Sequence, residues 1–531
     1  MFLRSPRFWS VALLVSGFCG ASCGARTAIL TSNAGPDAGT DAPVFVACAA
    51  DLDCATGDAC AGAACREGTC VPLPATVCND NDECTTDACD PSSGKCTFTS
   101  ITLDLDGDGH KSPRPGFAPG APGSCGDDCD DRSAAAHPGG IEACDGVDND
   151  CNGQVDEGAA YGSPSMAVRV SSAAFDRASG AGLAFDGKNY GAIYTGHKAT
   201  SSSYFQGLAP NGVSVVPETP LTDINAETYA GSVLHNGSFF ERVWEDARQD
   251  QNYEVYFNRF DSNGKKLGPD LRVTNAAKFS LNSALAWNGT ETLLVWDDRR
   301  FEQQAPDARI FGQRVSFDGS LVGGNIALTP AGIQAEHPGI ALGTKRVGVA
   351  FTSQQTSTTV HAQFLNTAPD LSDVSKVVDL GGSGVESTNL VALGDRFLVA
   401  WDQNTSVAGY GASIFGAVVD QNGNVLRTPQ PLTSGATIAR SFSLLSLGNR
   451  ALLVWADNHD GNFEIYAETL SQNMEVLTPR VRLSFSPTDS FFPAASFGPN
   501  GDVGVLYQDW QTNFPQVYFV SMGCAIGVPV K

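Results

Sequence analysis

Acidic residues crowd the stretch from residue 101 to residue 160, and the first part of it has the spacing of a calcium-binding loop. Candidate ligands fall at loop positions 1, 3, 5 and 7, the last through its carbonyl oxygen: Asp104, Asp106, Asp108 and His110. Gly109 takes position 6, where such loops turn sharply. Because carboxylates this dense repel one another unless a cation neutralises them, the spacing predicts a site for a hard, oxygen-preferring metal.

A second loop repeats the pattern, with candidate ligands at positions 1, 3, 5, 7 and 9: Asp148, Asp150, Asn152, Gln154 and Asp156. Neither loop has the position-12 Glu of standard calcium loops, because Pro115 and Ala159 fall there. A bidentate ligand is therefore expected from the 127–131 cluster or the end of the segment, where the candidates are Asp128, Asp130, Asp131 and Glu157. The alternative interpretation is an acidic, solvated loop.

The stretch from Asp104 to Glu157 contains D-x-D-G-D-G, then D-C-D-D, then H-P-G-x-x-E-x-C-D-G-x-D-N-D-C-x-G-x-x-D-E. It resembles the repeat of the MopE family of metal-binding, copper-associated bacterial surface proteins. That resemblance implies copper, whereas the ligands favour calcium, because copper seeks imidazole, thiolate or thioether groups. The segment offers only His110 and His137 as imidazoles, has no Met, and its four Cys are expected in disulfides.

Cysteines are distributed very unevenly. Of the sixteen in the chain, thirteen lie between Cys48 and Cys151, and none occurs between Cys151 and Cys524. Few large apolar residues separate those of the 44–100 segment, so crosslinks must hold its fold. Such an array indicates disulfides and an oxidising compartment.

The second cluster of that segment reads C-N-D-N-D-E-C-T-T-D-A-C-D-P-S-S-G-K-C, from Cys78 to Cys96. It resembles the short Cys repeat of slime-mould extracellular proteins, which also occurs in surface proteins of predatory bacteria. Zinc is the alternative role for these cysteines. It is disfavoured because the spacings are not C-x-x-C pairs and the segment has no His.

The number of cysteines predicts one long-range bond. Signal cleavage would remove Cys19 and acylation would occupy Cys23, which leaves thirteen cysteines before the repeats, an odd number, and Cys524. We therefore expect Cys524 to bond one of the thirteen. Spacing does not identify the partner. Cys151 is nearest in sequence, whereas the 44–100 segment holds nine cysteines, an odd number that leaves one without a partner inside it. A free or intermolecular Cys524 satisfies the same count.

The N-terminus has the features of an export signal. Arg4 and Arg7 precede an apolar run too short to span a bilayer stably, and small residues follow. The residues before Cys23 resemble a bacterial lipobox, so the predicted location is the outer membrane or cell surface, with membrane contact only through a lipid on Cys23. Plain secretion and a transmembrane anchor are the alternatives.

A repeat of about fifty residues fills the rest of the chain. Each unit has a strand that ends in an aromatic residue, at intervals of 50, 52, 55, 50, 54 and 52 residues: Tyr194, Trp244, Trp296, Phe351, Trp401, Trp455 and Tyr507. Tight Gly turns and further strands flank it, which predicts four antiparallel strands per unit and a seven-bladed β-propeller. The strand-like run 166–170 should complete the last blade and close the ring. A β-solenoid or an array of sandwiches is the competing architecture.

Acidic residues follow the aromatic one in five units: Glu245, Asp246, Asp297, Asp298, Asp402, Asp457 and Asp509. They could ring one face and bind a cation or a sugar. Because they recur with the fold, we interpret them as turn residues that accept backbone N–H groups, and the four Trp as blade core.

The sequence as a whole predicts a mainly β protein with five parts: a signal peptide (1–22), a lipidated Cys and tether (23–43), a disulfide-rich module (44–100), a metal-binding module (101–160) and the propeller (161–531). The charge of −25 disfavours nucleic acid as a partner. Because the repeats show no nucleophile–base pair, the favoured function is a non-enzymatic surface protein that binds a glycan or protein ligand. The alternatives are an exported polysaccharide hydrolase or lyase with its site in the propeller funnel, and a copper-binding surface protein.

Overall fold

The computed structural model describes residues 47–526, apart from 56, 146, 157–158, 199–200, 223–227, 230, 250–251, 303–306, 355–357, 367–370, 372–373, 405–411, 434–436 and 512–513. The predicted signal peptide, the predicted lipid anchor Cys23 and the tether lie outside the described residues. Among the residues that are described, no helix has the length and apolar character needed to cross a membrane.

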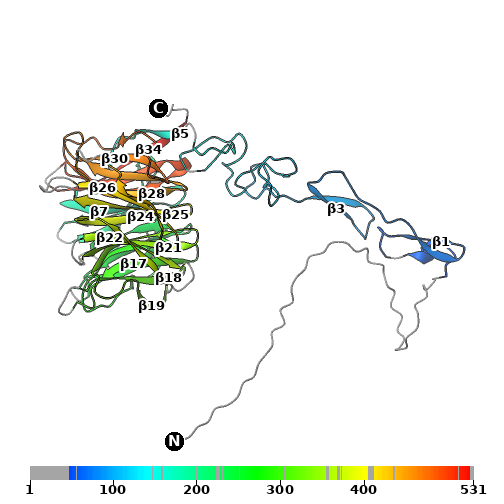
Figure 1. Cartoon of the computed structure of the whole chain (residues 1–531), viewed down its shortest axis with the longest axis horizontal. Coiled ribbons are helices and arrows are strands. Elements are labelled where there is room, and N and C mark those ends of the chain that lie inside the picture. Colours follow the sequence, from blue (N-terminus) through cyan, green and yellow to red (C-terminus); the bar gives the residue numbers. More distant parts are fainter. Residues whose placement is uncertain are drawn as a thin grey trace, which may run out of the picture. The chain divides into compact units, whose positions relative to one another are not determined.

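The chain divides into two compact units, Met1–Asp82 with Thr86–Thr99 and Glu83–Thr85 with Ser100–Lys531. The first contains a 3-10 turn and two hairpins, β1–β2 and β3–β4, labelled in part in Figure 1: η1 (Asp51–Cys54), β1 (Ala63–Arg66), β2 (Thr69–Pro72), β3 (Thr85–Cys89) and β4 (Cys96–Ser100). Its only buried hydrophobic residues, among those described, are Cys54 and Ala64. Crosslinks therefore replace a core here.

All fourteen cysteines from Cys48 onward are paired in seven disulfides. Four lie in the first unit: Cys48–Cys65, Cys54–Cys70, Cys60–Cys89 and Cys78–Cys96. Three lie in the second: Cys84–Cys125, Cys129–Cys151 and Cys144–Cys524. The expected bond between Cys524 and a cysteine of the preceding modules is confirmed, and its partner is Cys144.

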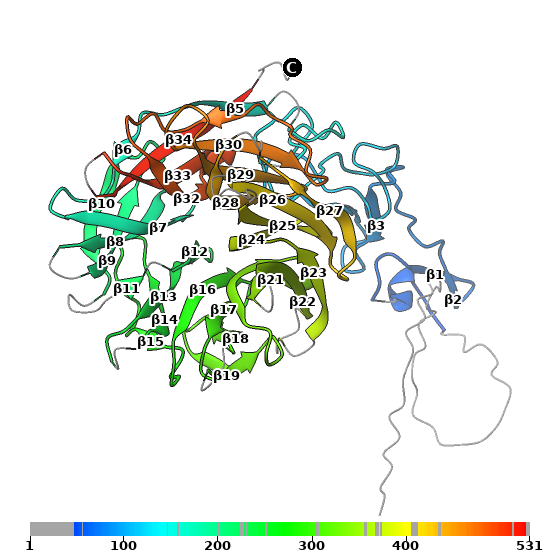
Figure 2. The same cartoon turned by 60° about the vertical axis from the view of Figure 1, so that its left-hand side comes forward.

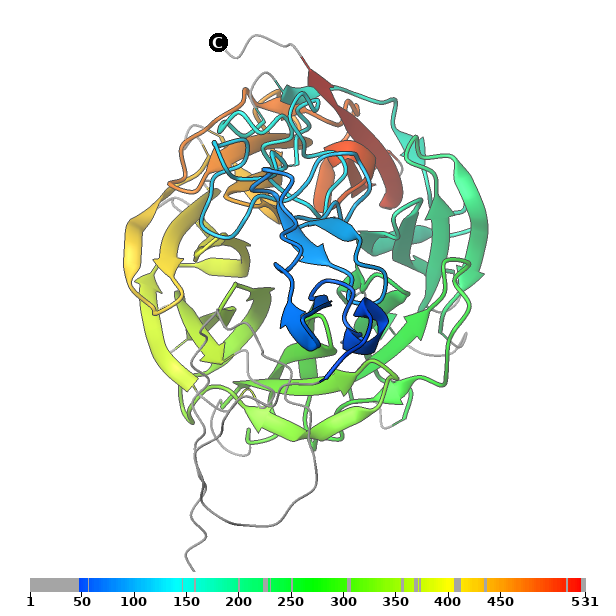
Figure 3. The same ribbon diagram turned by 90° about the vertical axis from the view of Figure 1, so that its right-hand side faces the viewer.

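Seven antiparallel sheets form the larger part of the second unit and surround a central axis, as Figures 2 and 3 show. The predicted seven-bladed propeller is confirmed. Blade 1 comprises β7 (Arg177–Phe185), β8 (Tyr190–His197), β9 (Ser201–Leu208) and β10 (Ser214–Pro220), and blade 2 comprises β11 (Thr228–Tyr229), β12 (Val233–His235), β13 (Phe240–Asp246), β14 (Glu254–Phe260) and β15 (Leu271–Arg272). Blade 3 comprises β16 (Ser280–Trp287), β17 (Glu291–Asp298), β18 (Arg309–Ser316) and β19 (Leu321–Ala327). Blade 4 comprises β20 (Ala335–Leu342), β21 (Arg346–Gln354), β22 (Thr358–Asn366) and β23 (Val374–Gly381).

Blades 5 to 7 continue in the same order. Blade 5 comprises β24 (Val385–Leu393), β25 (Arg396–Asn404), β26 (Ala412–Asp420) and β27 (Val425–Pro431). Blade 6 comprises β28 (Ala439–Leu447), β29 (Arg450–Asp457), β30 (Glu464–Ser471) and β31 (Val481–Arg482). Blade 7 comprises β32 (Ser490–Phe497), η2 (Pro499–Gly501), β33 (Val503–Asp509) and β34 (Gln516–Ile526), and it is joined by β5 (Ala159–Pro164) and β6 (Val168–Arg169). In each blade the strand that lines the central channel is the first one, and in blade 2 the short β12 takes this place.

The last blade closes the ring with strands from before the first. β6 pairs with β34 through Val168 opposite Phe519 and Arg169 opposite Tyr518, which confirms the closure predicted for residues 166–170. β5 pairs with the far end of the same strand, with Tyr161 opposite Cys524. The ring therefore has no free edge at its seam.

The aromatic residue at the end of each second strand is core, as expected. All seven are at most 2% exposed. Trp296, for example, packs against Val243 and Phe257 of the preceding blade. Its Nε1–H donates to Asp298 Oδ2 at 2.9 Å, and Trp244 and Trp455 donate in the same way to the acid two residues later. The acid in this second position therefore serves the fold, because it satisfies the buried indole N–H.

The innermost strands are bulged near their first residues, at one face of the ring. Register shifts occur there in blades 1, 3, 4, 5, 6 and 7. Four non-Gly residues at these bulges have positive φ: Asn282 (54°), His337 (53°), Ser441 (50°) and Phe492 (54°). Such backbone is strained and re-aims side chains, and two of these residues, Asn282 and Phe492, line a pocket at the mouth of the channel.

Candidate functional site

The first acidic loop brings three carboxylates together. Oxygens of Asp104, Asp106 and Asp108 lie within 4.8 Å of one another. The N–H groups of Gly107 and Gly109 donate to Asp104, at 2.7 and 3.1 Å, which fixes the turn. The second oxygens of Asp106 and Asp108 are buried without a hydrogen-bond partner. Buried carboxylate oxygens without donors need a cation, so these residues fit a metal with oxygen ligands.

Two acids of the 127–131 cluster reach this loop. Asp128 is 1% exposed and its Oδ2 has no hydrogen-bond partner. Burial raises the pKa of Asp128, and the charges of Asp108, Asp106 and Asp131 raise it further. Asp131 accepts the N–H of Leu105 at 3.0 Å, within the loop itself. The structure therefore brings Asp128 and Asp131 to the three carboxylates of the first loop. The side chain of Asp130 is exposed.

The second loop is built in the same way. Asp148 accepts the N–H groups of Gly153 at 2.7 Å and Asn152 at 3.1 Å. The third carboxylate within 4.8 Å of Asp148 and Asp150 is Glu142, which also accepts the Asp150 N–H at 2.9 Å. Sequence reasoning missed Glu142, although it is the Glu of the H-P-G-x-x-E-x-C pattern.

One predicted ligand of the second loop, Asp156, points elsewhere. Asp156 is buried and its Oδ2 accepts Nη1 of Arg450 at 2.9 Å, so it faces the propeller. Asn152 donates its amide to Asp150 at 2.9 Å, and Gln154 is exposed. Glu157 lies outside the described residues. Asp156 is therefore engaged with Arg450, because the chain leaves the loop there to join the blades. The roles predicted for Asn152 and for the Gln154 carbonyl stay predictions.

The two imidazoles form a pair rather than a ligand set with the loop. The rings of His110 and His137 stack with centroids 4.9 Å apart and planes 8° apart. His110 Nδ1 lies 3.1 Å from Asp127 Oδ1, and this hydrogen bond raises the pKa of His110. The side chain of His110 is thus engaged with Asp127, which leaves its carbonyl for the loop.

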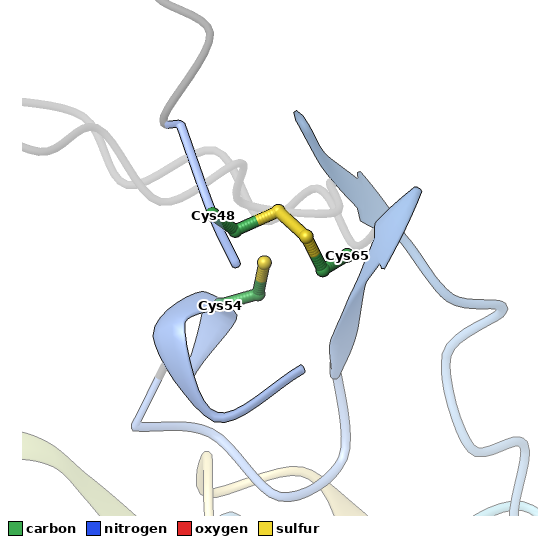
Figure 4. Close-up of side chains that lie close together, drawn as sticks. All are labelled: Cys48, Cys54 and Cys65. Carbon is green, nitrogen blue, oxygen red and sulfur yellow. A yellow bond between two sulfur atoms is a disulfide. The ribbon is translucent and has the colours of Figure 1, made fainter. Parts of the chain in front are cut away.

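Sulfur ligands are not available in the described cysteine clusters. Figure 4 shows the Cys48–Cys65 disulfide with the Cys54 sulfur directed toward it, and Cys54 is itself bonded to Cys70. Cys129 and Cys151, which lie beside Asp128, are bonded to each other. The donors that remain are carboxylate oxygens, which fit calcium better than copper or zinc.

A second candidate site lies in the propeller, at the face where the inner strands begin. A pocket of about 810 Å³ opens there between blades 1, 2, 3 and 7. It adjoins the central channel, a cavity of about 670 Å³ lined by the inner strands, and Asn282 and Ser283 line both. The pocket is wide enough for a sugar-sized ligand.

Glu245 is the buried acid of this pocket. It is 5% exposed, and its Oε1 accepts both the N–H and the hydroxyl of Ser283, at 2.7 and 2.6 Å. Burial raises the pKa of Glu245, against the lowering effect of the Ser283 hydrogen bonds and of Arg242. Sequence reasoning interpreted Glu245 as a turn residue that accepts backbone N–H groups. Glu245 does accept the Ser283 N–H, but it does so from within a strand and from the next blade, because the residue directly after the aromatic faces that blade.

A further acid lies behind the pocket wall. Asp297, the blade-3 counterpart of Glu245, is fully buried and accepts the amide of Asn282 at 2.6 Å. Burial raises the pKa of Asp297 to about 7, with a further contribution from Glu336. Arg299 binds Glu336 at 2.9 Å on the same side. This group holds the bulged Asn282 in position at the mouth.

The rest of the pocket wall is aromatic and polar. Phe279 and Phe492 are 42% and 54% exposed, and Tyr253 lies beside Phe279, with ring centroids 5.8 Å apart. His197 also lines the pocket, and its two ring nitrogens contact the hydroxyls of Ser201 at 2.6 Å and Ser179 at 3.2 Å. Aromatic faces beside a few convergent polar groups are typical of ligand pockets.

Two family models match short parts of the chain. Residues 128–157 match the copper-binding MopE motif, described as metal-binding, and residues 77–101 match the Dictyostelium (slime mold) repeat. Protein psiF of Dictyostelium discoideum is 48% identical over 52 residues, which are 10% of this chain and 7% of that protein. Both resemblances seen in the sequence are confirmed. The chain matches only a small part of the length of the slime-mould protein.

Solved structures similar to this chain include other propellers. A Trypanosoma rangeli sialidase is 7% identical and matches 67% of this chain and 59% of its own, with a TM-score of 0.39. An endo-arabinase from Bacteroides thetaiotaomicron is 13% identical and matches 55% of this chain and 90% of its own, with a TM-score of 0.30. Likeness at this level shows the fold.

The interpretation of the chain as a non-enzymatic binding protein is not kept, and the enzyme alternative is taken up below from the pocket itself. The similar solved propellers include glycoside hydrolases, but likeness at this level shows the fold and carries no argument on activity. No residue role is carried over from them, because the identity is too low. The chemistry has to be derived from the pocket of this chain.

Proposed function

We propose that the propeller is a hydrolase that acts on a glycan, with its site in the pocket at the channel mouth and Glu245 as the proton donor. One observation carries the proposal: a pocket of about 810 Å³ combines a buried carboxyl group of raised pKa with exposed aromatic rings. A buried carboxyl group of raised pKa is the kind of group that donates a proton to the leaving oxygen in glycoside cleavage.

The hydrogen bonds of Glu245 set where its proton lies. Its Oε1 accepts two hydrogen bonds from Ser283, so a proton on Glu245 would be carried by Oε2. In the reaction Glu245 gives this proton to the glycosidic oxygen as the bond to the anomeric carbon breaks. A water molecule adds to that carbon and loses its proton to a base, which completes hydrolysis.

The base that we assign is His197. It is the one imidazole among the residues that line the pocket, and His is the side chain that most often acts as a general base. Phe279, Phe492 and Tyr253 would hold the sugar face, while Asn282 and Gln508 offer amide groups to its hydroxyls.

Release of reducing sugar from a panel of neutral and acidic polysaccharides tests the proposal. The wild-type chain should cleave at least one of them, and Glu245→Gln, which keeps the shape and the Ser283 contacts, should lower kcat by about 100-fold or more. Asp395→Asn is the control, since Asp395 is 79% exposed in a turn. Unchanged activity in the Glu245→Gln variant, or no cleavage of any polysaccharide, would contradict the proposal.

We further propose that the two acidic loops bind calcium. Support comes from the donor atoms, which are carboxylate oxygens, and from the orphaned oxygens of Asp106, Asp108 and Asp128. The first site would use Asp104, Asp106, Asp108, Asp128 and the His110 carbonyl, and the second Glu142, Asp148 and Asp150. Metal analysis after dialysis against calcium and copper together tests this. Two or more bound calcium ions are expected, and copper in their place would overturn it.

The seven disulfides indicate an exported protein. Our proposal for its final place is the outer membrane or cell surface, through an acyl chain on Cys23, with surface glycan as the partner. Cys23→Ala should release the chain into the exported, membrane-free fraction. Continued partition with membranes would show that Cys23 is not the anchor.

A further inference from the structure

A single arginine is buried between blades 1 and 2, at a position that is apolar in every other blade. Arg242 is fully buried and stands two residues before Trp244. The counterparts two residues before the aromatic of the other six blades are Ala192, Leu294, Val349, Val399, Leu453 and Val505. Blade 2 therefore carries a cation where the fold needs none.

The guanidinium of Arg242 is only partly satisfied. Its Nη2 donates to Ser203 Oγ at 2.8 Å, and its charged carbon lies 5.1 Å from the ring centre of Trp244. Nε and Nη1 have no hydrogen-bond partner. A buried guanidinium usually has both a partner charge and acceptors for its N–H groups, because desolvating an unpaired charge is costly.

The nearby carboxylates are engaged with other groups. Glu245 accepts from Ser283, and Asp246 and Asp270 bind Arg248 at 2.5 and 2.7 Å. In the part of the chain that the structure describes, Arg242 makes no salt bridge with any of them. Burial lowers the pKa of Arg242 to about 10, so the group is still charged at neutral pH.

The wall opposite Arg242 is also polar where other blades are apolar. Ser203 faces it from the third strand of blade 1, and the other blades have Val or Ile there: Val255, Ile310, Val360, Ile414, Ile465 and Val517. Thr195 pairs directly with Ser203, so both side chains lie on the face toward Arg242. The Thr195 hydroxyl is buried without a hydrogen-bond partner.

We propose that this gap binds a small monovalent inorganic anion of the halide class, held by Nε–H and Nη1–H of Arg242 and by the Thr195 hydroxyl. Every group left without a partner there can donate a hydrogen bond, and the only charge among them is positive. An acceptor with a single negative charge satisfies both requirements, and it adds hydrogen bonds to the electrostatic attraction that Glu245, Asp246 and Asp270 already exert on Arg242. Arg242 and Ser203 stand where the other six blades have apolar residues, and Thr195 stands where three of those blades have a carboxylate.

The bound anion would also act on the proposed proton donor, a consequence that rests on the proposed function. Arg242 lowers the pKa of Glu245, and Thr195 lines the same pocket as Glu245. Neutralising Arg242 with an anion therefore keeps Glu245 protonated to higher pH. Activity in chloride should extend to more alkaline pH than activity in gluconate, which is too large to enter.

Thermal melting tests the site independently of any activity. The full chain is heated in sodium chloride, bromide or gluconate at equal ionic strength, and the halides should raise its Tm by roughly 2 °C or more. Arg242→Leu, which copies blade 3, should lose this halide-dependent shift. Arg314→Leu is the control and should keep it, because Arg314 pairs with Glu291 at a half-buried position elsewhere. An equal halide shift in Arg242→Leu and wild type would overturn the proposal.

If Arg242→Leu does not fold, crystals of the wild-type chain grown in bromide decide the matter. An anomalous bromide peak between Arg242 and Thr195 is expected. Its absence, with bromide visible elsewhere, would show that no such site exists.

Discussion

Cys144 and Cys524 are 380 residues apart in the sequence and are joined by a disulfide, with their Cα atoms 5.6 Å apart. Cys524 lies in β34, the strand of the last blade with which β5 and β6 pair. The bond thus fastens the metal-binding segment to the last blade at the seam of the ring. Beside it, the hydroxyl of Tyr161 donates to the Cys144 carbonyl at 3.2 Å.

Removing this bond by the double substitution Cys144→Ser and Cys524→Ser should lower stability. A crosslink over so long a loop restricts the unfolded chain strongly, so the expected loss is up to about 5 kcal/mol. Calorimetry of the variant measures it. Non-reducing peptide mapping of the wild type is the companion experiment, and a Cys524 peptide recovered as a free thiol would contradict the pairing.

Asp156 and Arg450 provide a second connection between the same parts. Their ion pair is 5% and 24% exposed, so an uncompensated Arg450 would be costly. Asp156→Asn should lower the free energy of unfolding by about 1–3 kcal/mol and leave the number of bound calcium ions unchanged. Asp148→Asn should instead lower the number of bound calcium ions and leave the contact between Asp156 and Arg450 intact. If Asp156→Asn loses a calcium ion, Asp156 is a ligand after all.

The repeat made the propeller predictable, and the odd number of cysteines before the repeats made the Cys524 bond predictable. The residues that surround each metal site were harder to predict, because they are brought together by turns of the chain. Glu142 reaches the second loop only through the turn at Gly139, and Asp156 leaves it for Arg450. Neither is visible in spacing along the chain.

The distinction between adjacent acids also needed the structure. Glu245 and Asp246 are neighbours in sequence, yet one lines a pocket and the other accepts the Trp244 indole N–H. Their side chains point to opposite faces of one strand, so each meets a different blade. A repeat tells which positions are equivalent, and only the packing of blades tells which face each one serves.

Calcium should make the acidic segment rigid. Removing it with a chelator leaves the carboxylates of Asp104, Asp106, Asp108 and Asp128 to repel one another, which should raise the rate of proteolysis between residues 101 and 158. Glu142→Gln should weaken binding at the second loop by about tenfold or more and spare the first. Cleavage rates that are identical with and without chelator would argue against a structural calcium.

Stability should depend on pH through Asp297. Its pKa is raised from 3.8 to about 7 by burial, so the folded state binds a proton that the unfolded state has lost. The stabilisation is therefore present below about pH 4 and is lost as pH rises toward 7. The stability lost over this range is a few kcal/mol, as an order of magnitude.

Comparing wild type with Asp297→Asn isolates this effect, since Asn can still accept from Asn282. Glu468, whose pKa burial also raises to about 7, contributes equally to both proteins. Urea unfolding between pH 4 and pH 8 should show a steeper loss in wild type. Parallel curves would show that Asp297 is ionised throughout.

The exposed aromatic rings at the pocket should bind substrate without supporting the fold. Phe279 and Phe492 are 42% and 54% exposed, so their truncation leaves little cavity and should change Tm by less than about 2 °C. Each ring lost from a sugar face removes about 1 kcal/mol of binding, so Phe279→Ala and Phe492→Ala should each raise KM roughly fivefold and leave kcat nearly unchanged. Phe98→Ala is the matched control, because Phe98 is 45% exposed and lies in the N-terminal unit. A fall in kcat with an unchanged KM would instead place these rings beside the reacting bond, and no effect in either would move the glycan out of this pocket.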